Sequence, residues 1–327
     1  MVGDAPQRVD IGGVSVAPLG VGTWAWGDTL MWSYSEAMDN ELQEAFDVCV
    51  SKGINLFDTA EIYGFGRSEY LCGKFKRDFA GPKEQKDDIA IASKFAPVPL
   101  PTRLTRKSVV ATCKNSLDRM GLQSMELYQL HWPAALLNKA YWDGLADCHE
   151  QGLVKAIGVS NYGPELLQKA HDALNARGVP LATNQIQYSL LSRKPEMSGL
   201  LDKCSSLGVK VLAYSPLAQG LLTGKYSEAN LPSGPRERMY KSMMPKITPL
   251  IATLTQIAQE REKTLSQVAL NWCIAKGTIP IPGAKNVRQA EENAGALGWQ
   301  LSPEEVFMLD EASDRAGVST QSMPLAS

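Results

Sequence analysis

Asp58 and Tyr63 stand five residues apart in the stretch NLFDTAEIYGFG, where a short apolar run gives way to glycine-rich sequence. Residues 55–57 are typical of a buried strand, and the two glycines that follow Tyr63 indicate a turn. A carboxylate accepts hydrogen bonds and pairs with cations, whereas a phenol donates a proton. The pattern therefore places two groups suited to polar chemistry at the end of a core strand.

Polar residues close several later apolar runs in the same way. Lys94 follows IAIAS, and His131 follows ELYQL. A lysine in such a position is costly to bury without an acidic partner, and Asp58 at the end of the preceding run is the candidate partner. Each residue alone has an ordinary structural explanation, such as a loop cap or a hydrogen-bonded core histidine. Their recurrence at successive strand ends favours one shared site, whose further members are Ser160, Asn161, Gln185, Tyr214 and Ser215.

The apolar runs alternate with amphipathic helical patterns, for example over residues 40–53, 105–121 and 164–178. Strands that alternate with helices indicate parallel βαβ units. Eight such units in 327 residues favour an α/β fold with a closed (β/α)8 TIM barrel, in which the carboxyl ends of the strands meet at one mouth. The predicted strands are residues 18–24, 55–60, 89–95, 126–132, 154–161, 182–188, 210–216 and 278–284.

Two segments depart from this alternation. Residues 8–16, RVDIGGVSV, predict an N-terminal β-hairpin that plugs the bottom of the barrel. Residues 222–250 are loop-rich and basic, and they predict a long flexible loop after the seventh strand that closes over a bound molecule. No linker rich in Pro, Gly and Ser divides the units, so we expect residues 1–327 to form a single domain.

The composition disfavours several classes of partner. The 33 basic and 35 acidic residues are interspersed, which argues against nucleic acid and an anionic membrane surface. The six cysteines stand singly, as in the reduced core of an intracellular protein. No apolar run approaches the roughly 18 residues of a membrane span, and the first ten residues lack a signal peptide's apolar stretch. We expect a soluble cytoplasmic protein, or a plastid protein if a transit peptide has been removed.

Longer stretches of the chain resemble the aldo-keto reductase family. They are FDTAEIYG, SKF, YQLHWP, GVSNY, NQIQYSLL, AYSPLAQGLLTGKY and IPGAKN followed by QAEEN, in the family's order over almost the whole chain. The IPGAKN segment is similar to a branch that includes plant and cyanobacterial members. The resemblance implies reduction of aldehydes or ketones to alcohols with NADPH. It also implies that Asp58, Tyr63, Lys94 and His131 form the catalytic tetrad.

The resemblance implies a role for each of these four residues. Hydride that arrives at a carbonyl carbon leaves negative charge on the oxygen, and Tyr63 is expected to donate the proton there as general acid. A free tyrosine has a pKa of about 10, which Lys94 beside the phenol is expected to lower. Asp58 is expected to hold the ammonium group of Lys94. His131 is expected to orient the carbonyl and share the proton work.

The resemblance also implies a cradle for NADPH or NADP+. Ser160, Asn161 and Gln185 are expected to hold the nicotinamide carboxamide, and Tyr214 to stack beneath the ring. A competing motif, GVGTWA over residues 20–25, matches a dinucleotide-binding fingerprint, but WGDTLMW follows it where that fingerprint requires a helix. The barrel pattern therefore disfavours a Rossmann site.

The adenosine end of the cofactor is expected after the eighth strand. Many family members carry a lysine-serine pair where this chain has Gly283 and Ala284, which leaves Lys285 to clamp a 2′-phosphate, with Arg288 nearby. Two cations near a helix N-terminus favour NADPH over NADH. The remaining expected cofactor contacts are Thr23, Trp24, Ser215, Leu217, Lys225, Gln289, Glu292 and Asn293.

The substrate is expected to be a small carbonyl compound in an apolar pocket lined by Trp26, Trp32 and Trp132. A metal site is not expected, because the three histidines are far apart and neither HxH nor HExxH occurs. We expect a monomer or a weak homo-oligomer. The alternative function is an NADPH-binding regulatory subunit that senses redox state, similar to the potassium-channel β subunits, although the intact tetrad favours turnover.

Overall fold

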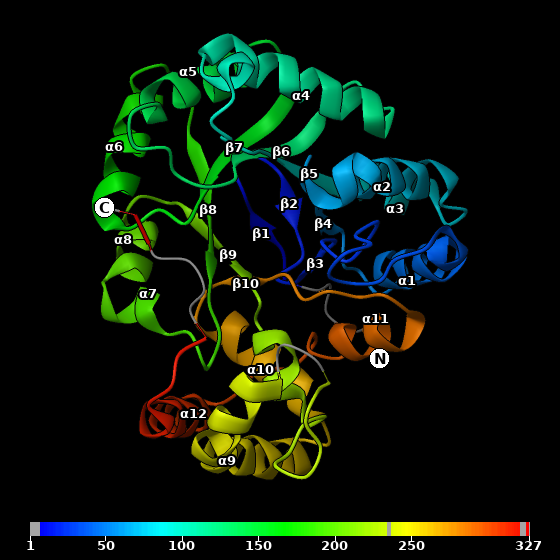
Figure 1. Ribbon diagram of the computed structural model, residues 1–327, viewed down its shortest axis with the longest axis vertical. Helices are drawn as coiled ribbons and strands as arrows, with labels where there is room; N and C mark the ends of the chain where they lie inside the picture. The colour runs from blue at the N-terminus through cyan, green and yellow to red at the C-terminus, as the bar shows by residue number, and fades with distance from the viewer. Residues whose placement is uncertain (1–6, 234–236, 321–324, 327) are drawn as a thin grey trace.

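Eight parallel strands form the centre of the molecule. The computed structural model describes residues 7–233, 237–320 and 325–326. The strands pair in chain order, and a bridge between Gly22 and Gly283 joins the two edges of the sheet, so the expected (β/α)8 barrel is confirmed. Helices surround it (Figure 1). The strands are β3 (Gly20–Gly22), β4 (Leu56–Asp58), β5 (Ala90–Phe95), β6 (Met125–Leu130), β7 (Val154–Ser160), β8 (Leu181–Gln187), β9 (Lys210–Tyr214) and β10 (Ile279–Pro280).

The helices bury one apolar face against the strands, as their periodic sequences predict. Three of them, α4, α10 and α12, begin with capping boxes at Thr105, Thr264 and Ser302, where side chains satisfy the first backbone N–H groups. The helices are α1 (Asp39–Ser51), α2 (Arg67–Asp78), α3 (Lys83–Asp88), α4 (Arg106–Met120), α5 (Asn138–Glu150), α6 (Pro164–Asn175), α7 (Lys194–Met197), α8 (Leu200–Ser206), α9 (Glu237–Glu260), α10 (Leu265–Ala275), α11 (Val287–Ala294) and α12 (Pro303–Ala316).

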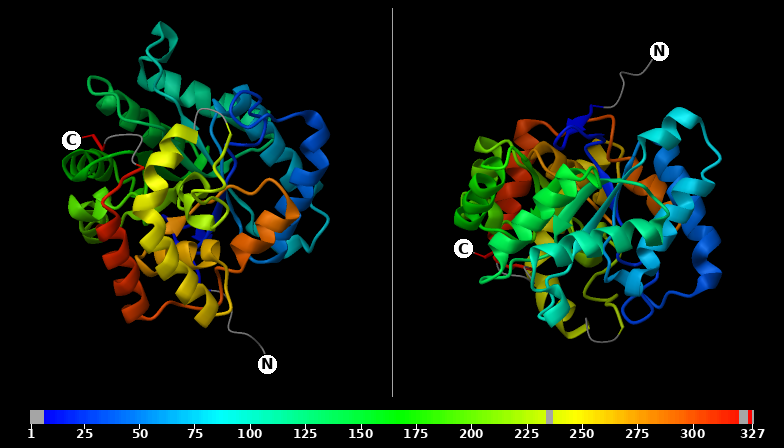
Figure 2. Two further views of the ribbon diagram at one scale, coloured as in Figure 1. Left: turned by 60° about the horizontal axis from the view of Figure 1, so that its bottom comes forward. Right: turned by 90° about the horizontal axis from the view of Figure 1, so that it is seen from above.

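The N-terminal hairpin closes one end of the barrel. Strands β1 (Val9–Asp10) and β2 (Ser15–Val16) pair antiparallel, as the sequence predicts. Ile11, Val14 and Val16 are buried in a cluster with apolar side chains from β4 to β10. The right-hand view of Figure 2 shows the hairpin, in blue, at one end and the segment after β9, in yellow-green, at the other. The plugged end leaves the carboxyl ends of the strands as the place for chemistry.

The segment after β9 differs from the expected loop. A short 3-10 helix, η4 (Ala218–Thr223), begins it, and residues 237–250 are the first part of α9, although Pro245 and Pro249 lie inside that helix. The helix survives because buried side chains at helical spacing, including Tyr240, Met244 and Ile247, pack on the barrel. Tertiary packing thus outweighs the backbone hydrogen bonds that the two prolines remove. The prediction of a flexible segment over all of residues 222–250 is wrong for its second half.

Two other sequence expectations are decided by the fold. A loop over residues 23–35, and no helix, follows β3, so the fingerprint match at residues 20–25 lacks the structure it requires. All six cysteines are buried with free thiols. Over the described part of the chain, no helix has both the length and the apolar character needed to cross a membrane.

Candidate active site

The four predicted catalytic residues converge at the carboxyl ends of β4, β5 and β6. Lys94 is fully buried, and its ammonium group donates to the Asp58 carboxylate and, over 2.7 Å, to the carbonyl oxygen of Thr59. The Lys94 nitrogen lies 5.1 Å from the centre of the Tyr63 ring. The Tyr63 and His131 rings stand edge to face with their centres 5.6 Å apart. The structure therefore brings all four residues into one cluster.

Asp58 is the centre of a wider polar network inside the barrel. Its second oxygen, Oδ2, accepts hydrogen bonds from the amides of Gln129, at 2.9 Å, and Gln185, at 2.8 Å. Sequence reasoning missed Gln129, although a glutamine inside the apolar run ELYQLHW was a usable signal, because such a group needs a buried partner. Gly158 on β7 lies beside Gln129, and a Cβ built there would lie 2.1 Å from Thr183 Oγ1 and 3.1 Å from Gln129 Cγ.

The environment sets the charge of Lys94 and Tyr63. Burial lowers the pKa of Lys94, but Asp58 and Tyr63 raise it by more, so the ammonium form is retained. Burial raises the pKa of Tyr63; Lys94 lowers it and Asp58 raises it, and the balance lies above the ordinary value. Lys94 thus lowers the pKa of Tyr63, as expected, but burial raises it by more. Lys94 limits the rise that burial causes.

His131 is held in its neutral form. Burial, followed by the charge of Lys94, brings the pKa of His131 well below its ordinary value. Its Nδ1 atom is buried and has no hydrogen-bond partner among the described residues. A buried polar atom without a partner is costly, and it marks a place where a bound polar group would be satisfied.

The residues expected around a nicotinamide form a chain of hydrogen bonds that leads to Asp58. The Tyr214 hydroxyl donates to Asn161 Oδ1 at 3.0 Å, and the Asn161 amide donates to Ser160 Oγ at 3.1 Å. Ser160 Oγ donates to the carbonyl oxygen of Gln185 at 2.8 Å. Asn161 has a left-handed backbone, with φ of 62°, which a non-glycine residue adopts at a cost. The side-chain amide nitrogen of Gln185 donates to Asp58 and Gln129, so its Oε1 atom is the part of the amide that can accept a hydrogen bond from a bound molecule.

A second group of expected cofactor residues surrounds the start of α11. The backbone N–H of Lys285 donates to Gln289 Oε1 at 2.8 Å, and the Asn293 amide donates to the carbonyl oxygen of Gly283 at 3.2 Å. The Lys285 ammonium lies 5.4 Å from the centre of the Trp32 ring in the loop after β3. Glu292 pairs with the exposed Arg288 at 3.8 Å. The group thus borders the loop over residues 23–35.

The remaining expected cofactor residues lie around the same end of the barrel but differ in exposure. The Thr23 hydroxyl is buried and donates to the carbonyl oxygen of Asp58 at 3.0 Å. Ser215 follows β9 with a left-handed φ of 52°, and Leu217 precedes η4. Lys225 is exposed, with its nitrogen 5.3 Å from the centre of the Tyr226 ring.

Aromatic side chains continue on both sides of Tyr63. The ring centre of Trp24 lies 6.4 Å from Tyr63 and 5.7 Å from Trp32, and that of Trp132 lies 4.8 Å from His131. Trp26, which was expected in the substrate wall, is 1% exposed and packs among core phenylalanines, and its indole N–H donates to the carbonyl oxygen of Ala284. Its place in the pocket is therefore wrong. The irregular loop turns Trp26 inward, whereas Trp24, two residues earlier, is exposed.

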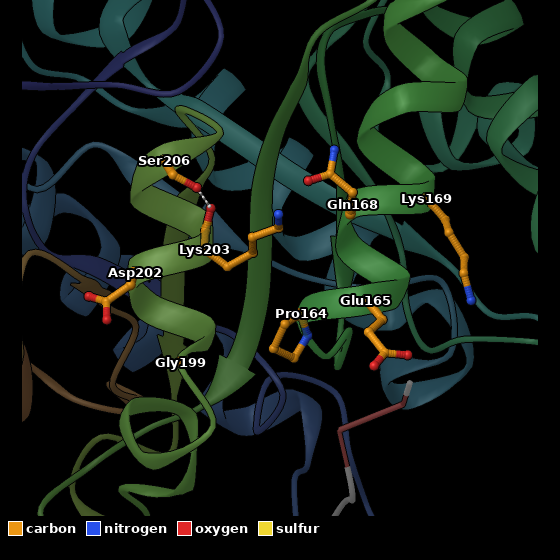
Figure 3. A pocket seen from close by; sticks show the side chains of 8 residues that line it. All are labelled: Pro164, Glu165, Gln168, Lys169, Gly199, Asp202, Lys203 and Ser206. Carbon is orange, nitrogen blue, oxygen red and sulfur yellow. Dashed lines mark hydrogen bonds between the residues drawn. The ribbon is translucent and has the colours of Figure 1, made fainter.

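A groove on the outside of the barrel contains none of these residues. It lies between α6 and α8, and Figure 3 shows Glu165 and Lys169 on one side and Asp202 and Lys203 on the other. Its charged rim belongs to the outer helices rather than to the strand ends. The chemistry-bearing side chains are instead packed against one another at the barrel mouth.

The sequence profile of the Aldo/keto reductase family matches residues 18–314. The chain belongs to this family. It is 48% identical over 315 residues to a chloroplastic pyridoxal reductase of Arabidopsis thaliana, which covers 94% of this chain and 86% of the relative. It is 31% identical to an L-glyceraldehyde 3-phosphate reductase of Escherichia coli, over 91% of this chain and 89% of the relative.

Solved aldo-keto reductases have the same fold. One from Klebsiella pneumoniae, crystallised in complex with NADPH, is 25% identical and superposes with a TM-score of 0.75 over 99% of each chain. Family membership and the reductase relatives make this chain an oxidoreductase, as the resemblance in its motifs predicts.

We predict that His131 makes the fold less stable in weak acid. An unfolded histidine gains a proton below a pH of about 6.5, whereas buried His131 resists protonation, so the free energy of unfolding falls as the pH falls through this range. One such proton contributes up to about 1.4 kcal/mol per pH unit. Urea unfolding at pH 6.5 and 5.5 should show a smaller loss for His131→Asn than for the wild type. His149→Asn, outside the cluster, is the control. Equal losses in the wild type and His131→Asn would contradict the neutral state.

Proposed function

We propose that this chain reduces an aldehyde to an alcohol with NADPH, with Tyr63 as the general acid. The observation that carries the proposal is the buried Lys94, which lies between the Asp58 carboxylate and the Tyr63 ring. An apolar side chain would pack this part of the barrel better than a desolvated ammonium group does. Its use is to stabilise negative charge that forms beside it.

The chain's own residues account for the polar part of the reaction. NADPH, when bound, supplies a hydride to the carbonyl carbon. Tyr63 is protonated at neutral pH, as a phenol with an ordinary pKa of about 10 already is, and burial favours this form further. It gives the proton to the carbonyl oxygen as charge develops there. Lys94 stabilises the phenolate that remains, and Asp58 keeps Lys94 charged and in place. Neutral His131 orients the carbonyl through a hydrogen bond.

The cofactor residues support NADPH by the chemistry of their side chains. Ser160, Asn161 and the Oε1 of Gln185 offer a donor and acceptor set that suits a carboxamide, and the Tyr214 ring offers a flat surface. Lys285 and Arg288 flank the N-terminus of α11, where an anion is stabilised. The relative solved with NADPH supports the same assignment.

The substrate is proposed to be an aromatic aldehyde of the pyridoxal type. The row of rings from Trp32 through Trp24 and Tyr63 to Trp132 supports it, because apolar area removed from water contributes about 25 cal/mol per Å². The name of the Arabidopsis relative supports both this substrate and the plastid as a location.

We expect Tyr63→Phe to lower kcat for an aldehyde by about 10² to 10⁴-fold, because the general acid is lost. NADPH binding should persist, since the phenol is proposed to contact only the reacting oxygen. NADPH consumption and fluorescence titration measure the two effects. Tyr70→Phe, an exposed phenol on α2, is the control. Wild-type kcat in Tyr63→Phe would rule out Tyr63 as the acid, and turnover limited by very slow NADP+ release in the wild type would favour the redox-sensor alternative.

We expect Lys285→Ala to raise KM for NADPH more than KM for NADH, because only the 2′-phosphate distinguishes the two cofactors. Initial rates with each cofactor at saturating aldehyde measure the effect. Lys155→Ala, at the start of β7 and the opposite end of the barrel, is the matched control. An equal change for both cofactors would place Lys285 away from the phosphate.

We expect pyridoxal and benzaldehyde to have higher kcat/KM values than glucose corrected for its open-chain fraction. Trp132→Ala should reduce this preference by raising KM for the aromatic aldehydes alone. Leu136→Ala is the control, because Leu136 lies in the same loop and is 99% exposed. Equal kcat/KM values for the aromatic and sugar aldehydes, unchanged in Trp132→Ala, would refute the aromatic wall.

A further inference from the structure

The backbone beside Tyr63 touches the loop after β3 without a side chain between them. Gly64 has a left-handed φ of 54°, and a Cβ built on it would lie 2.4 Å from the carbonyl oxygen of Gly27. That distance is shorter than any real contact of a Cβ atom. Gly64 is the residue directly after Tyr63, so the fit of the two loops bears on where the phenol lies.

The loop over residues 23–35 is itself fastened to the start of α2. A Cβ on Gly27 would lie 2.6 Å from both Cβ and Cγ of Arg67. The Arg67 guanidinium donates to the Tyr34 hydroxyl at 2.9 Å and to Asp39 Oδ2 at 2.6 Å, and Tyr34 donates to Asp39 Oδ1 at 2.6 Å. A guanidinium group that donates to two partners fixes their orientation as well as their distance.

Tyr63 is thus enclosed on several sides. Lys94 and His131 approach its ring from the barrel, and Trp24 approaches from the loop over residues 23–35. The Gly27 backbone lies against Gly64, the residue after Tyr63. Unlike Lys94, the loop approaches Tyr63 with groups that take no part in the buried ion pair.

We propose that the contact between Gly27 and Gly64, held by Arg67, sets the position of the Tyr63 phenol, with Gly64 and Arg67 as positioning residues. The inference rests on the proposed role of Tyr63 as general acid. A side chain at position 64 must move the loop or displace Tyr63, and a displacement of about 1 Å at a reacting group costs on the order of 10²-fold in rate. The contact between Gly27 and Gly64 thereby acts on catalysis through the position of Tyr63.

The first experiment compares Gly64→Ala with Gly178→Ala in the full-length protein. Gly178 also has a left-handed backbone, with φ of 70°, but no atom lies within 4 Å of a Cβ built there. The pair therefore separates the clash from backbone strain. Gly64→Ala should lower kcat about 10²-fold with pyridoxal and leave the Kd for NADPH unchanged, whereas Gly178→Ala should keep wild-type kcat. Equal kcat values in the two variants would overturn the proposal.

The second measurement tests whether Gly64 acts through Tyr63. In a Tyr63→Phe background, Gly64→Ala should cause no further loss of kcat, because the group it positions is gone. A full additional loss would overturn the proposal. NADPH deuterated at the transferred hydrogen should give a larger isotope effect on kcat in Gly64→Ala than in the wild type. Failure of Tyr63→Phe to lower kcat would instead refute the proposed function, so the two failures are distinguishable.

The third experiment leaves Gly27 and Gly64 unchanged and weakens the hydrogen bonds of Arg67. Arg67→Gln removes the charged fork, and Arg67→Lys keeps the charge but not the paired hydrogen bonds. We expect kcat to fall in the order wild type, Arg67→Lys, Arg67→Gln, with an unchanged Kd for NADPH. This arm decides the matter if Gly64→Ala does not fold. Wild-type kcat in Arg67→Gln would show that Arg67 is not needed to position Tyr63.

Discussion

The ion pair between Asp58 and Lys94 is the interaction on which the rest of the candidate site depends. A lysine ammonium group inside the barrel is tolerable only with an ionised partner at hydrogen-bonding distance. The pair fills one oxygen of Asp58, and the other must also be satisfied, which brings in the amides of Gln129 and Gln185. One buried charge therefore determines the polar contents of four strands, β4, β5, β6 and β8.

The same requirement links the chemistry to the cofactor side of the mouth. Gln185 uses its N–H groups on Asp58 and Gln129, and its backbone carbonyl oxygen receives Ser160. Ser160 and Asn161 continue the chain to Tyr214. The proposed carboxamide contacts and the proposed acid thus share a single hydrogen-bond network. A substitution at Gln185 is expected to disturb both, which would make its effects on KM and kcat inseparable.

Features that recur along the chain or depend on residue type could be predicted from the sequence, whereas features that depend on packing could not. The eight strands follow from apolar runs, and the cluster of Asp58, Tyr63, Lys94 and His131 follows from polar residues near strand ends together with family motifs. The prediction for Trp26 was wrong because residue type does not show whether a tryptophan in a loop is exposed or buried. The path of the backbone decides that Trp24 is exposed and Trp26 is buried. The two prolines concealed the start of α9, whose buried face outweighs them. Gly64 gives no signal on its own, since its importance lies in the distance to Gly27.

The raised pKa of Tyr63 favours the phenol form that the proposed reduction uses. A tyrosine with an ordinary pKa of about 10 is already protonated at neutral pH, and burial stabilises this form further. Oxidation of an alcohol would need the phenolate as base, which burial disfavours. Lys94 moderates the difference, because its positive charge is the largest single influence that lowers the pKa of Tyr63. In the proposed reaction, desolvation disfavours the phenolate of Tyr63, and the buried ion pair stabilises that phenolate when charge forms on the carbonyl oxygen.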